Sequence, residues 1–95
     1  MSLASPPPPV TLPAQPRLSR RFRLQYENAQ SRWVLLYPEG MVQLNDSAAE
    51  ILKRCDGSRT LAAIVQELEQ AFNTQGIAPQ VQDLLQEGMR RGWIE

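Results

Sequence analysis

The side chains that most often carry out chemistry in proteins are scarce in this sequence. Its 95 residues include no histidine and one cysteine, Cys55. Without histidine there is no Ser-His-Asp triad, no Cys-His pair and no imidazole ligand for a metal. A single thiol cannot form an internal disulfide, a zinc ribbon or an iron–sulfur cluster. The sequence therefore favours a binding protein over an enzyme, and it predicts no catalytic residue, no metal site and no cofactor.

The remaining candidates for chemistry have structural interpretations. Cys55 falls on the apolar side of a predicted helix, where a lone cysteine is typically a small core residue. No histidine or second thiol is available to activate it. Asp83 and Glu87 are one helical turn apart, but no further ligand accompanies them. We expect solvated helix faces at the four carboxylates Glu67, Glu69, Asp83 and Glu87.

Charge and hydropathy exclude further classes. Ten cations balance ten anions, so the chain lacks the concentrated positive field that sequence-independent nucleic-acid binding requires. No apolar run approaches the length of a membrane span. Residues 1–14 have neither the basic nor the apolar region of a secretory signal. We therefore expect a cytoplasmic protein with no membrane and no nucleic-acid partner.

The composition changes at about residue 21. Six of the eight prolines lie in the first sixteen residues, which carry no charged side chain. Such sequence favours polyproline II and cannot build a packed core. Four arginines follow between Arg17 and Arg23, and they predict a solvated entry to a strand, with binding to an acidic partner as the alternative. We predict a flexible tail over residues 1–21, or else a proline-rich ligand for a partner's groove, and one domain over residues 22–95.

The domain opens with the pattern of a small sheet. Phe22–Tyr26 alternates apolar and polar residues, as a half-buried strand does. Arg32–Tyr37 is rich in aromatic and β-branched residues. Residues 38–40 predict a three-residue hairpin loop with Gly40 in the left-handed conformation. The returning strand, Met41–Leu44, should then lie at an edge of the sheet.

Three helices are expected after the strands. The capping-box spacing of Ser47 and Glu50 predicts a helix over about Ala48–Cys55, ended by Gly57 in the left-handed conformation. Thr60 is expected to cap the second helix, whose apolar residues recur at helical spacing. Those residues are Leu61, Ile64, Val65, Leu68 and Phe72.

The third helix should begin near Pro79 and end at Gly92. Trp93 and Ile94 are expected to fold back onto the core. The apolar stripe of this helix consists of Val81, Leu84, Leu85, Gly88 and Met89. The resulting class is α+β, a winged-helix-like arrangement in which a three-stranded antiparallel sheet precedes three helices.

This arrangement allows more than one function. In a DNA-binding regulator the third helix would read bases, but Asp83 and Glu87 would then face phosphates. In a peptide-binding protein the unpaired N–H and C=O groups of the edge strand would accept an added strand, and Leu85 and Met89 would form a groove beside it. A third interpretation is an ordinary edge covered by a loop or by a second copy, which would give a homodimer.

Four short segments at characteristic spacing carry a family resemblance. They are LLYPEG at Leu35–Gly40, LN at Leu44–Asn45, AAEIL at Ala48–Leu52 and CDGSRT at Cys55–Thr60. Together they resemble the PqqD family, the D proteins of pyrroloquinoline quinone (PQQ) biosynthesis, over about residues 22–94. The resemblance implies a winged-helix-like recognition element for RiPPs (ribosomally synthesised and post-translationally modified peptides), which is not an enzyme.

The same resemblance implies a function and a site. Members of the family are peptide chaperones that bind the ribosomal PQQ precursor peptide and present it to a radical-SAM cross-linking enzyme, which holds the iron–sulfur cluster. In related recognition elements the peptide adds as a strand beside the third strand and packs against the third helix. On this sequence the implied contacts are Met41, Val42, Gln43, Leu44, Leu84, Leu85, Gly88 and Met89.

Overall fold

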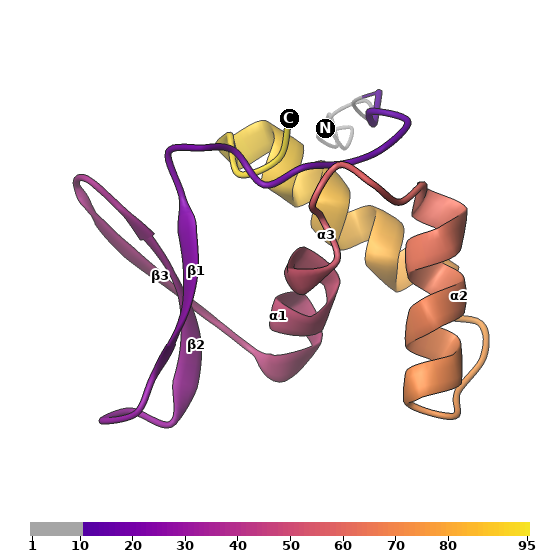
Figure 1. Ribbon diagram of the computed structural model, residues 1–95, viewed down its shortest axis with the longest axis horizontal. Helices are drawn as coiled ribbons and strands as arrows, with labels where there is room; N and C mark the ends of the chain where they lie inside the picture. The colour runs from indigo at the N-terminus through magenta and orange to yellow at the C-terminus, as the bar shows by residue number, and fades with distance from the viewer. Residues whose placement is uncertain (1–10) are drawn as a thin grey trace, which may run out of the picture.

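A three-stranded sheet with three helices against one face forms the molecule (Figure 1). The computed structural model describes residues 11–95, so the predictions for residues 1–10 lie outside the described part. The elements, in chain order, are β1 (Arg23–Glu27), β2 (Arg32–Tyr37), β3 (Gly40–Leu44), α1 (Asp46–Lys53), α2 (Leu61–Ala71) and α3 (Ala78–Arg91). The α+β class and the order of the elements are confirmed, and winged-helix-like is a loose description of them.

The sheet is antiparallel, with the strands in the order β1-β2-β3. Leu24, Leu35 and Val42 stand opposite one another across the three strands. All three belong to or pack against the core, and Leu35 is fully buried. This face of the sheet therefore carries the helices, and the strand order leaves β3 at an edge, as predicted.

The hairpin between β2 and β3 differs from the prediction. Tyr37 pairs with Gly40, so the loop contains only Pro38 and Glu39. Gly40 does not have a positive φ; it is the first residue of β3. The expectation of a left-handed glycine was wrong because a two-residue turn already reverses the chain.

The start of α1 also differs from the prediction. The side-chain oxygen Oδ1 of Asn45 accepts a hydrogen bond from the backbone N–H of Ala48 at 2.7 Å. Asn45, and not Ser47, is thus the N-cap, because asparagine caps a helix as well as serine does. Glu50 does not complete a capping box, since its carboxylate binds Lys53 and Arg54.

The later helix boundaries agree with the predictions. The Thr60 hydroxyl accepts from the N–H of Ala63 at 3.1 Å. Pro79 lies in the first turn of α3, and Gly92 ends that helix in the left-handed conformation with φ 79°. Trp93 and Ile94 fold back and are buried. Gly57 is left-handed as expected, but α1 has already ended at Arg54, so Gly57 shapes the turn between α1 and α2.

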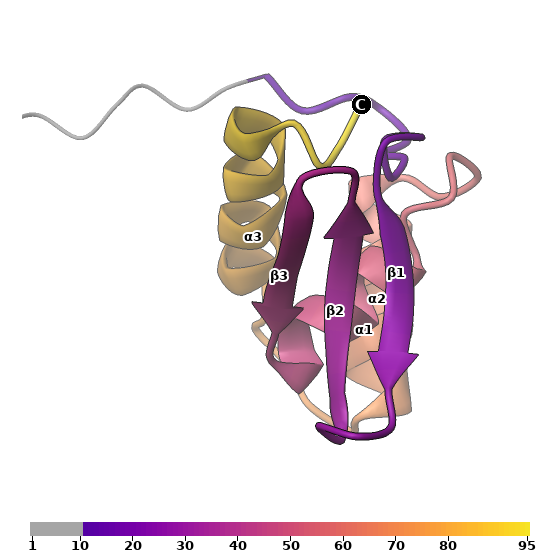
Figure 2. The same ribbon diagram turned by 90° about the vertical axis from the view of Figure 1, so that its left-hand side faces the viewer.

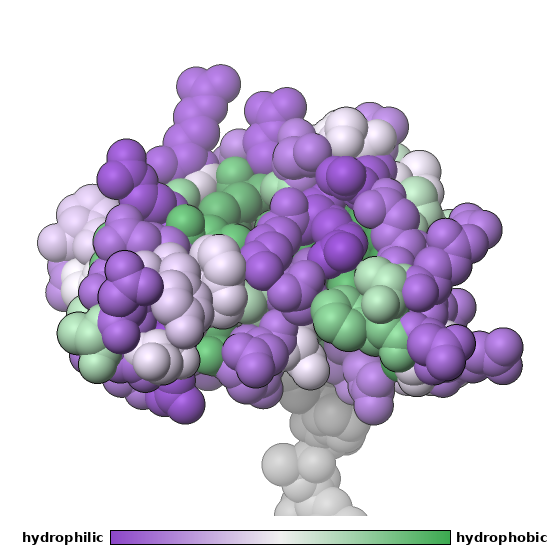
Figure 3. Space-filling view, turned by 60° about the horizontal axis from the view of Figure 1, so that its bottom comes forward, coloured by the Kyte–Doolittle hydropathy of each residue, from purple (hydrophilic) through white to green (hydrophobic). Residues whose placement is uncertain are grey.

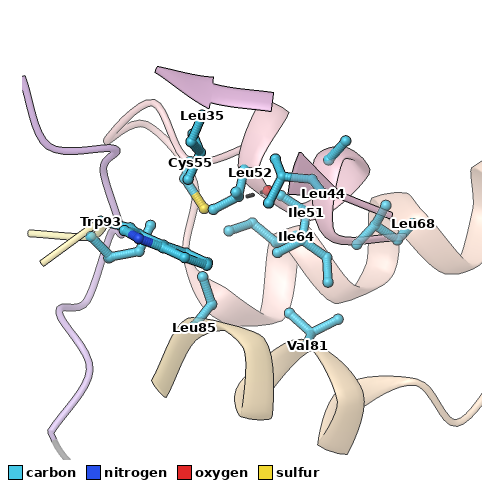
Figure 4. Close-up of a cluster of buried hydrophobic side chains, with 12 residues drawn as sticks. Leu35, Leu44, Ile51, Leu52, Cys55, Ile64, Leu68, Val81, Leu85 and Trp93 are labelled. Carbon is cyan, nitrogen blue, oxygen red and sulfur yellow. Dashed lines mark hydrogen bonds between the residues drawn. The ribbon is translucent and has the colours of Figure 1, made fainter. Parts of the chain in front are cut away.

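The core lies between the sheet and the helices (Figure 4). Cys55 is buried in it, and its Sγ donates to the carbonyl oxygen of Ile51 at 3.4 Å. Burial raises the pKa of this thiol to about 12, so it stays protonated and unreactive at neutral pH. The prediction of a core cysteine is confirmed. Phe72, predicted to continue the buried face of α2, is instead 56% exposed at the end of that helix.

Residues 16–19 form a strap that pairs with the turn after α1 and with the last residues of the chain. The N–H groups of Leu18 and Ser19 donate to the carbonyls of Cys55 and Trp93 at 2.9 and 2.7 Å. Arg17 and Glu95 exchange two backbone hydrogen bonds, and Pro16 is fully buried. These four residues therefore pack with the domain and not with a flexible tail. Backbone pairing of this kind leaves no side-chain pattern, so the sequence did not show it; the division into tail and domain otherwise stays a prediction.

Candidate functional site: a sheet edge beside a helix

The candidate site is the free edge of β3 together with the neighbouring surface of α3. In Figure 1 α3 belongs to the helical layer, and in Figure 2 it lies laterally beyond the edge of β3. Within residues 11–95 no strand pairs with β3 on that side. A chain added to the edge would therefore lie across the exposed surface of α3.

The residues of β3 alternate between two faces of the sheet. Val42 and Leu44 stand opposite Leu35 and Trp33, on the face that carries the helices, and Leu44 is buried. Met41 and Gln43 point the other way. Met41 is 47% exposed, and the Gln43 side chain accepts a hydrogen bond from the Arg32 guanidinium at 2.6 Å.

The hairpin register also determines which backbone groups of β3 face outward. In an antiparallel pair, residues alternate between hydrogen-bonded and non-hydrogen-bonded positions. The residues that flank a two-residue turn form a hydrogen-bonded pair, here Tyr37 and Gly40. Counting along the strand, Val42 directs its N–H toward β2, whereas Met41 and Gln43 direct theirs toward the free edge. The edge thus offers two outward N–H groups to a visiting chain.

The predicted residues on α3 fall into two groups. Leu85 is fully buried in the core, and Gly88 is buried beneath Ile94, whose Cγ1 would lie 2.8 Å from a Cβ at this position. These two residues have no surface to offer a peptide. Leu84 and Met89 are half-buried and pack against the core from the side. Leu84 and Met89 are five residues and thus about 140° apart around α3, so they cannot both face β3. Met89 lies on the side of the helix where Ala78 and Gln82 face α2. Leu84 is therefore the accessible candidate beside β3, and Leu85 and Gly88 lie beneath the surface.

The YPEG and CDG segments have structural roles in turns. Asp56 accepts hydrogen bonds from the N–H and the hydroxyl of Ser58 at 2.9 and 2.5 Å, and these bonds lower the pKa of its carboxyl group. Arg59 binds both Asp56 and Glu67. The turn between α1 and α2 is thus held by its own polar side chains.

Three of the four carboxylates expected to be solvated have partners. Glu87, on α3, binds the guanidinium of Arg91. Glu67 receives the Arg59 guanidinium at 2.6 Å. Glu69 accepts from the backbone N–H groups of Gly76 and Ile77 at 2.8 and 3.3 Å, so it closes the loop between α2 and α3. The part of the chain that the structure describes holds no group of three or more His, Cys, Asp or Glu side chains placed to bind a metal.

A second concave surface was not foreseen from the sequence. We call it the end groove; its volume is about 480 Å³ and it opens where α1 begins and α2 ends. Exposed Phe72 and the loop residue Ile77 stand on its wall. The apolar type of Ile77 in an otherwise polar loop was the only hint of it in the sequence. It is lined by Ile51, Leu68, Phe72, Ile77 and Val81, with Asp46, Ser47, Glu50, Thr74 and Gln80 at the polar positions.

The fold with its open edge is that of a known class. The solution structure of the PqqD truncation of Methylobacterium extorquens PqqCD superimposes with a TM-score of 0.74 at 29% sequence identity, over 90% of this chain and 95% of that one. That protein is described as a functional, stand-alone RiPP recognition element. The present chain therefore has the fold of a RiPP recognition element.

Sequence comparison identifies the family. The model for coenzyme PQQ synthesis protein D (PqqD) matches residues 32–94. A PqqA binding protein from Azotobacter vinelandii is 52% identical over 87 residues, which cover 90% of this chain and 95% of the relative. Another from Methylococcus capsulatus is 48% identical over 77 residues, or 81% of this chain and 83% of the relative. The chain belongs to the PqqD family.

These similarities give no support to the DNA-binding alternative. The helices among residues 11–95 include none that is both long and apolar enough to cross a membrane.

Proposed function

We propose that this protein is a peptide chaperone of PQQ biosynthesis. In this proposal it binds the PqqA precursor peptide by strand addition and presents it to a radical-SAM cross-linking enzyme. The observation that carries the proposal is the unpaired edge of β3, with α3 in the next layer just beyond it. The names and families of its relatives support the identity of the peptide.

The division of labour at the site follows from its geometry. The outward N–H and C=O groups of β3 bind any extended chain, so they contribute affinity with little selectivity. Val42 and Leu84 are half-buried, and they are placed to receive apolar side chains of the added strand. Leu44, Leu85 and Gly88 act beneath them as support. Met41 and Gln43 contribute mainly through their main-chain groups.

The protein contributes no chemistry of its own in this proposal. Its single thiol is buried with a raised pKa, so the bond-forming step belongs to the enzyme that receives the peptide. We place the protein in the cytoplasm, because the precursor peptide that it binds in this proposal is made by the ribosome. A second copy paired through the β3 edge would form a homodimer and would compete with the peptide.

The direct test is titration with the PqqA peptide, following backbone amide shifts residue by residue. We expect the largest shifts at residues 41–44 and at the exposed positions of α3, with a stoichiometry of one peptide per chain. A scrambled peptide of the same composition serves as the control. Shifts confined to other elements, or tighter binding to duplex DNA than to PqqA at physiological salt, would contradict the proposal.

A further inference from the structure

The end groove has the composition of a side-chain pocket. Half of its ten lining residues are apolar, and the most exposed of them, Phe72, has more than half of its surface in solvent. Figure 3, which brings the lower side of the molecule in Figure 1 forward, shows apolar surface exposed between polar side chains on this side. A volume of about 480 Å³ lies within the range of ligand-binding pockets.

The end groove lies where the β3 edge stops. β3 ends at Leu44, Asn45 caps α1, and the next two residues, Asp46 and Ser47, already line the groove. The side chain of Leu44 lies next to those of Ile51 and Leu68, which form the groove's wall (Figure 4).

The same continuity holds along α3. Gln80 and Val81, in its first turn, line the end groove. Leu84, one turn later, is the α3 residue that the proposed site places beside β3. A strand advances about 3.3 Å per residue, so a peptide leaving the end of β3 reaches the groove within its next few residues.

We propose that the end groove is a second subsite for the peptide bound at β3, and that it takes a large apolar side chain from the residues that continue past Leu44. This inference rests on the proposed function. It adds a contact for the peptide residues that lie beyond the strand paired with β3. Its apolar wall selects the side chain by burial, which contributes about 25 cal/mol for each Å² of apolar surface removed from water.

The charges that line the end groove predict which type of residue lies next to that apolar residue in the peptide. The lining includes two carboxylates, Asp46 and Glu50, and no cation. Glu50 is already bound by Lys53 and Arg54, so Asp46 provides the preference. A lysine or arginine next to the apolar residue is the complement, and an acidic residue there would be repelled.

The test compares Phe72→Asp with Gln70→Asp. Both positions are exposed near the end of α2, and both variants add one negative charge, but only Phe72 lines the groove. We expect Phe72→Asp to weaken PqqA binding about tenfold, or about 1.4 kcal/mol, and Gln70→Asp to change it less than twofold. In the wild type, the amides of Phe72 and Ile77 should shift on titration with PqqA.

A shortened peptide separates this inference from the proposed function. PqqA trimmed to the segment that pairs with β3 should bind wild type and Phe72→Asp equally, because the groove is then empty in both complexes. If the wild type does not bind PqqA at all, the proposed function fails, and the subsite with it. If full-length PqqA binds both proteins equally and Phe72 and Ile77 do not shift, only the subsite is wrong. If Phe72→Asp keeps its affinity for PqqA but loses the enzyme, the groove serves the enzyme and the inference is overturned.

Discussion

The β3 edge and the end groove use different parts of the polypeptide. At the edge the outward-facing groups are backbone N–H and C=O, and the half-buried side chain of Leu84 on α3 is the neighbouring candidate. In the end groove all the apolar surface comes from side chains, among them Phe72 and Ile77. A backbone edge accepts many sequences, whereas a side-chain pocket accepts few. In the proposed complex, the β3 edge would therefore contribute mainly affinity, and the end groove would contribute selectivity for one side chain of the same peptide.

The β3 edge and the end groove also pack on the same cluster of buried side chains. Leu44 and Leu85, below the edge, belong to the same buried cluster as Ile51, Leu68 and Val81, below the groove. A substitution in that cluster cannot report on one surface alone. Only the residues that stand above it, such as Gln43, Leu84 and Phe72, can distinguish them.

The largest effect is expected for Leu85→Asp. A carboxylate at this fully buried position would lie in the core without a partner, and such changes cost about 4–5 kcal/mol or more. We expect the variant to unfold and to lose binding at both surfaces. Labelling of Cys55 by a thiol reagent measures this, because the buried thiol should react rapidly only in the unfolded chain.

Leu84→Asp is the matched control one residue away. Leu84 is half-buried, so its carboxylate can reach solvent and the fold should persist with Cys55 protected. Loss of PqqA binding by this folded variant would locate the binding surface beside β3. Wild-type affinity in a folded Leu84→Asp would exclude this side of α3 from the site.

Removal of the strap should have the next largest effect. A chain lacking residues 1–19 loses the backbone hydrogen bonds to Cys55, Trp93 and Glu95, each worth about 1 kcal/mol. We expect destabilisation by about 2–4 kcal/mol in a denaturant titration. The strap holds the segment behind Gly88, so binding at the β3 edge should suffer more than binding at the end groove. Deletion of residues 1–10 leaves the strap intact and should change neither stability nor affinity.

Two proline substitutions test which N–H groups of β3 face the free edge. Gln43→Pro removes an outward N–H, so it should weaken PqqA binding about tenfold with little loss of stability. Val42→Pro removes an N–H that bonds to β2, so it should disrupt the hairpin and lower the melting temperature. Peptide titration and thermal melts of both variants test this. If instead Val42→Pro weakens binding and Gln43→Pro lowers the melting temperature, the alternation of inward and outward N–H groups along β3 is shifted by one residue.

The smallest effect concerns pH. Hydrogen bonds from Ser58 and from Lys53 lower the pKa values of Asp56 and Glu50, respectively. A carboxylate whose pKa is lower in the folded state stabilises the fold above its unfolded pKa, and this contribution is lost as pH falls through the folded value. We expect stability to decrease below about pH 4, with a shallower decrease in Asp56→Asn. Melting temperatures between pH 3 and pH 7 measure the difference.

Local sequence patterns were sufficient for most of the fold. The predicted bounds of β2 are those observed, and Thr60, Pro79 and Gly92 mark helix ends because each acts on the backbone next to it. The edge position of β3 followed from two successive hairpins. These features depend on contacts between residues close in the chain, which are the contacts that a sequence displays.

Competition between neighbouring signals explains the local errors. Asn45 and Ser47 are both good caps, and only the path of the chain out of β3 decides that Asn45 is used. Similarly, Gly40 permits a left-handed loop, but the register of β2 against β3 selects the shorter turn without it.

What the sequence alone determined was the class of the protein, the order of its elements and the family to which it belongs. What only the tertiary structure decided was which apolar residues remain accessible. Leu84 and Leu85 are both leucines on the same predicted stripe, yet Leu85 is fully buried while Leu84 is partly exposed. Phe72 continues the apolar face of α2 but stands at the end of that helix and is mostly exposed. Burial depends on what packs above a residue from distant parts of the chain, and helical periodicity carries no information about that neighbour.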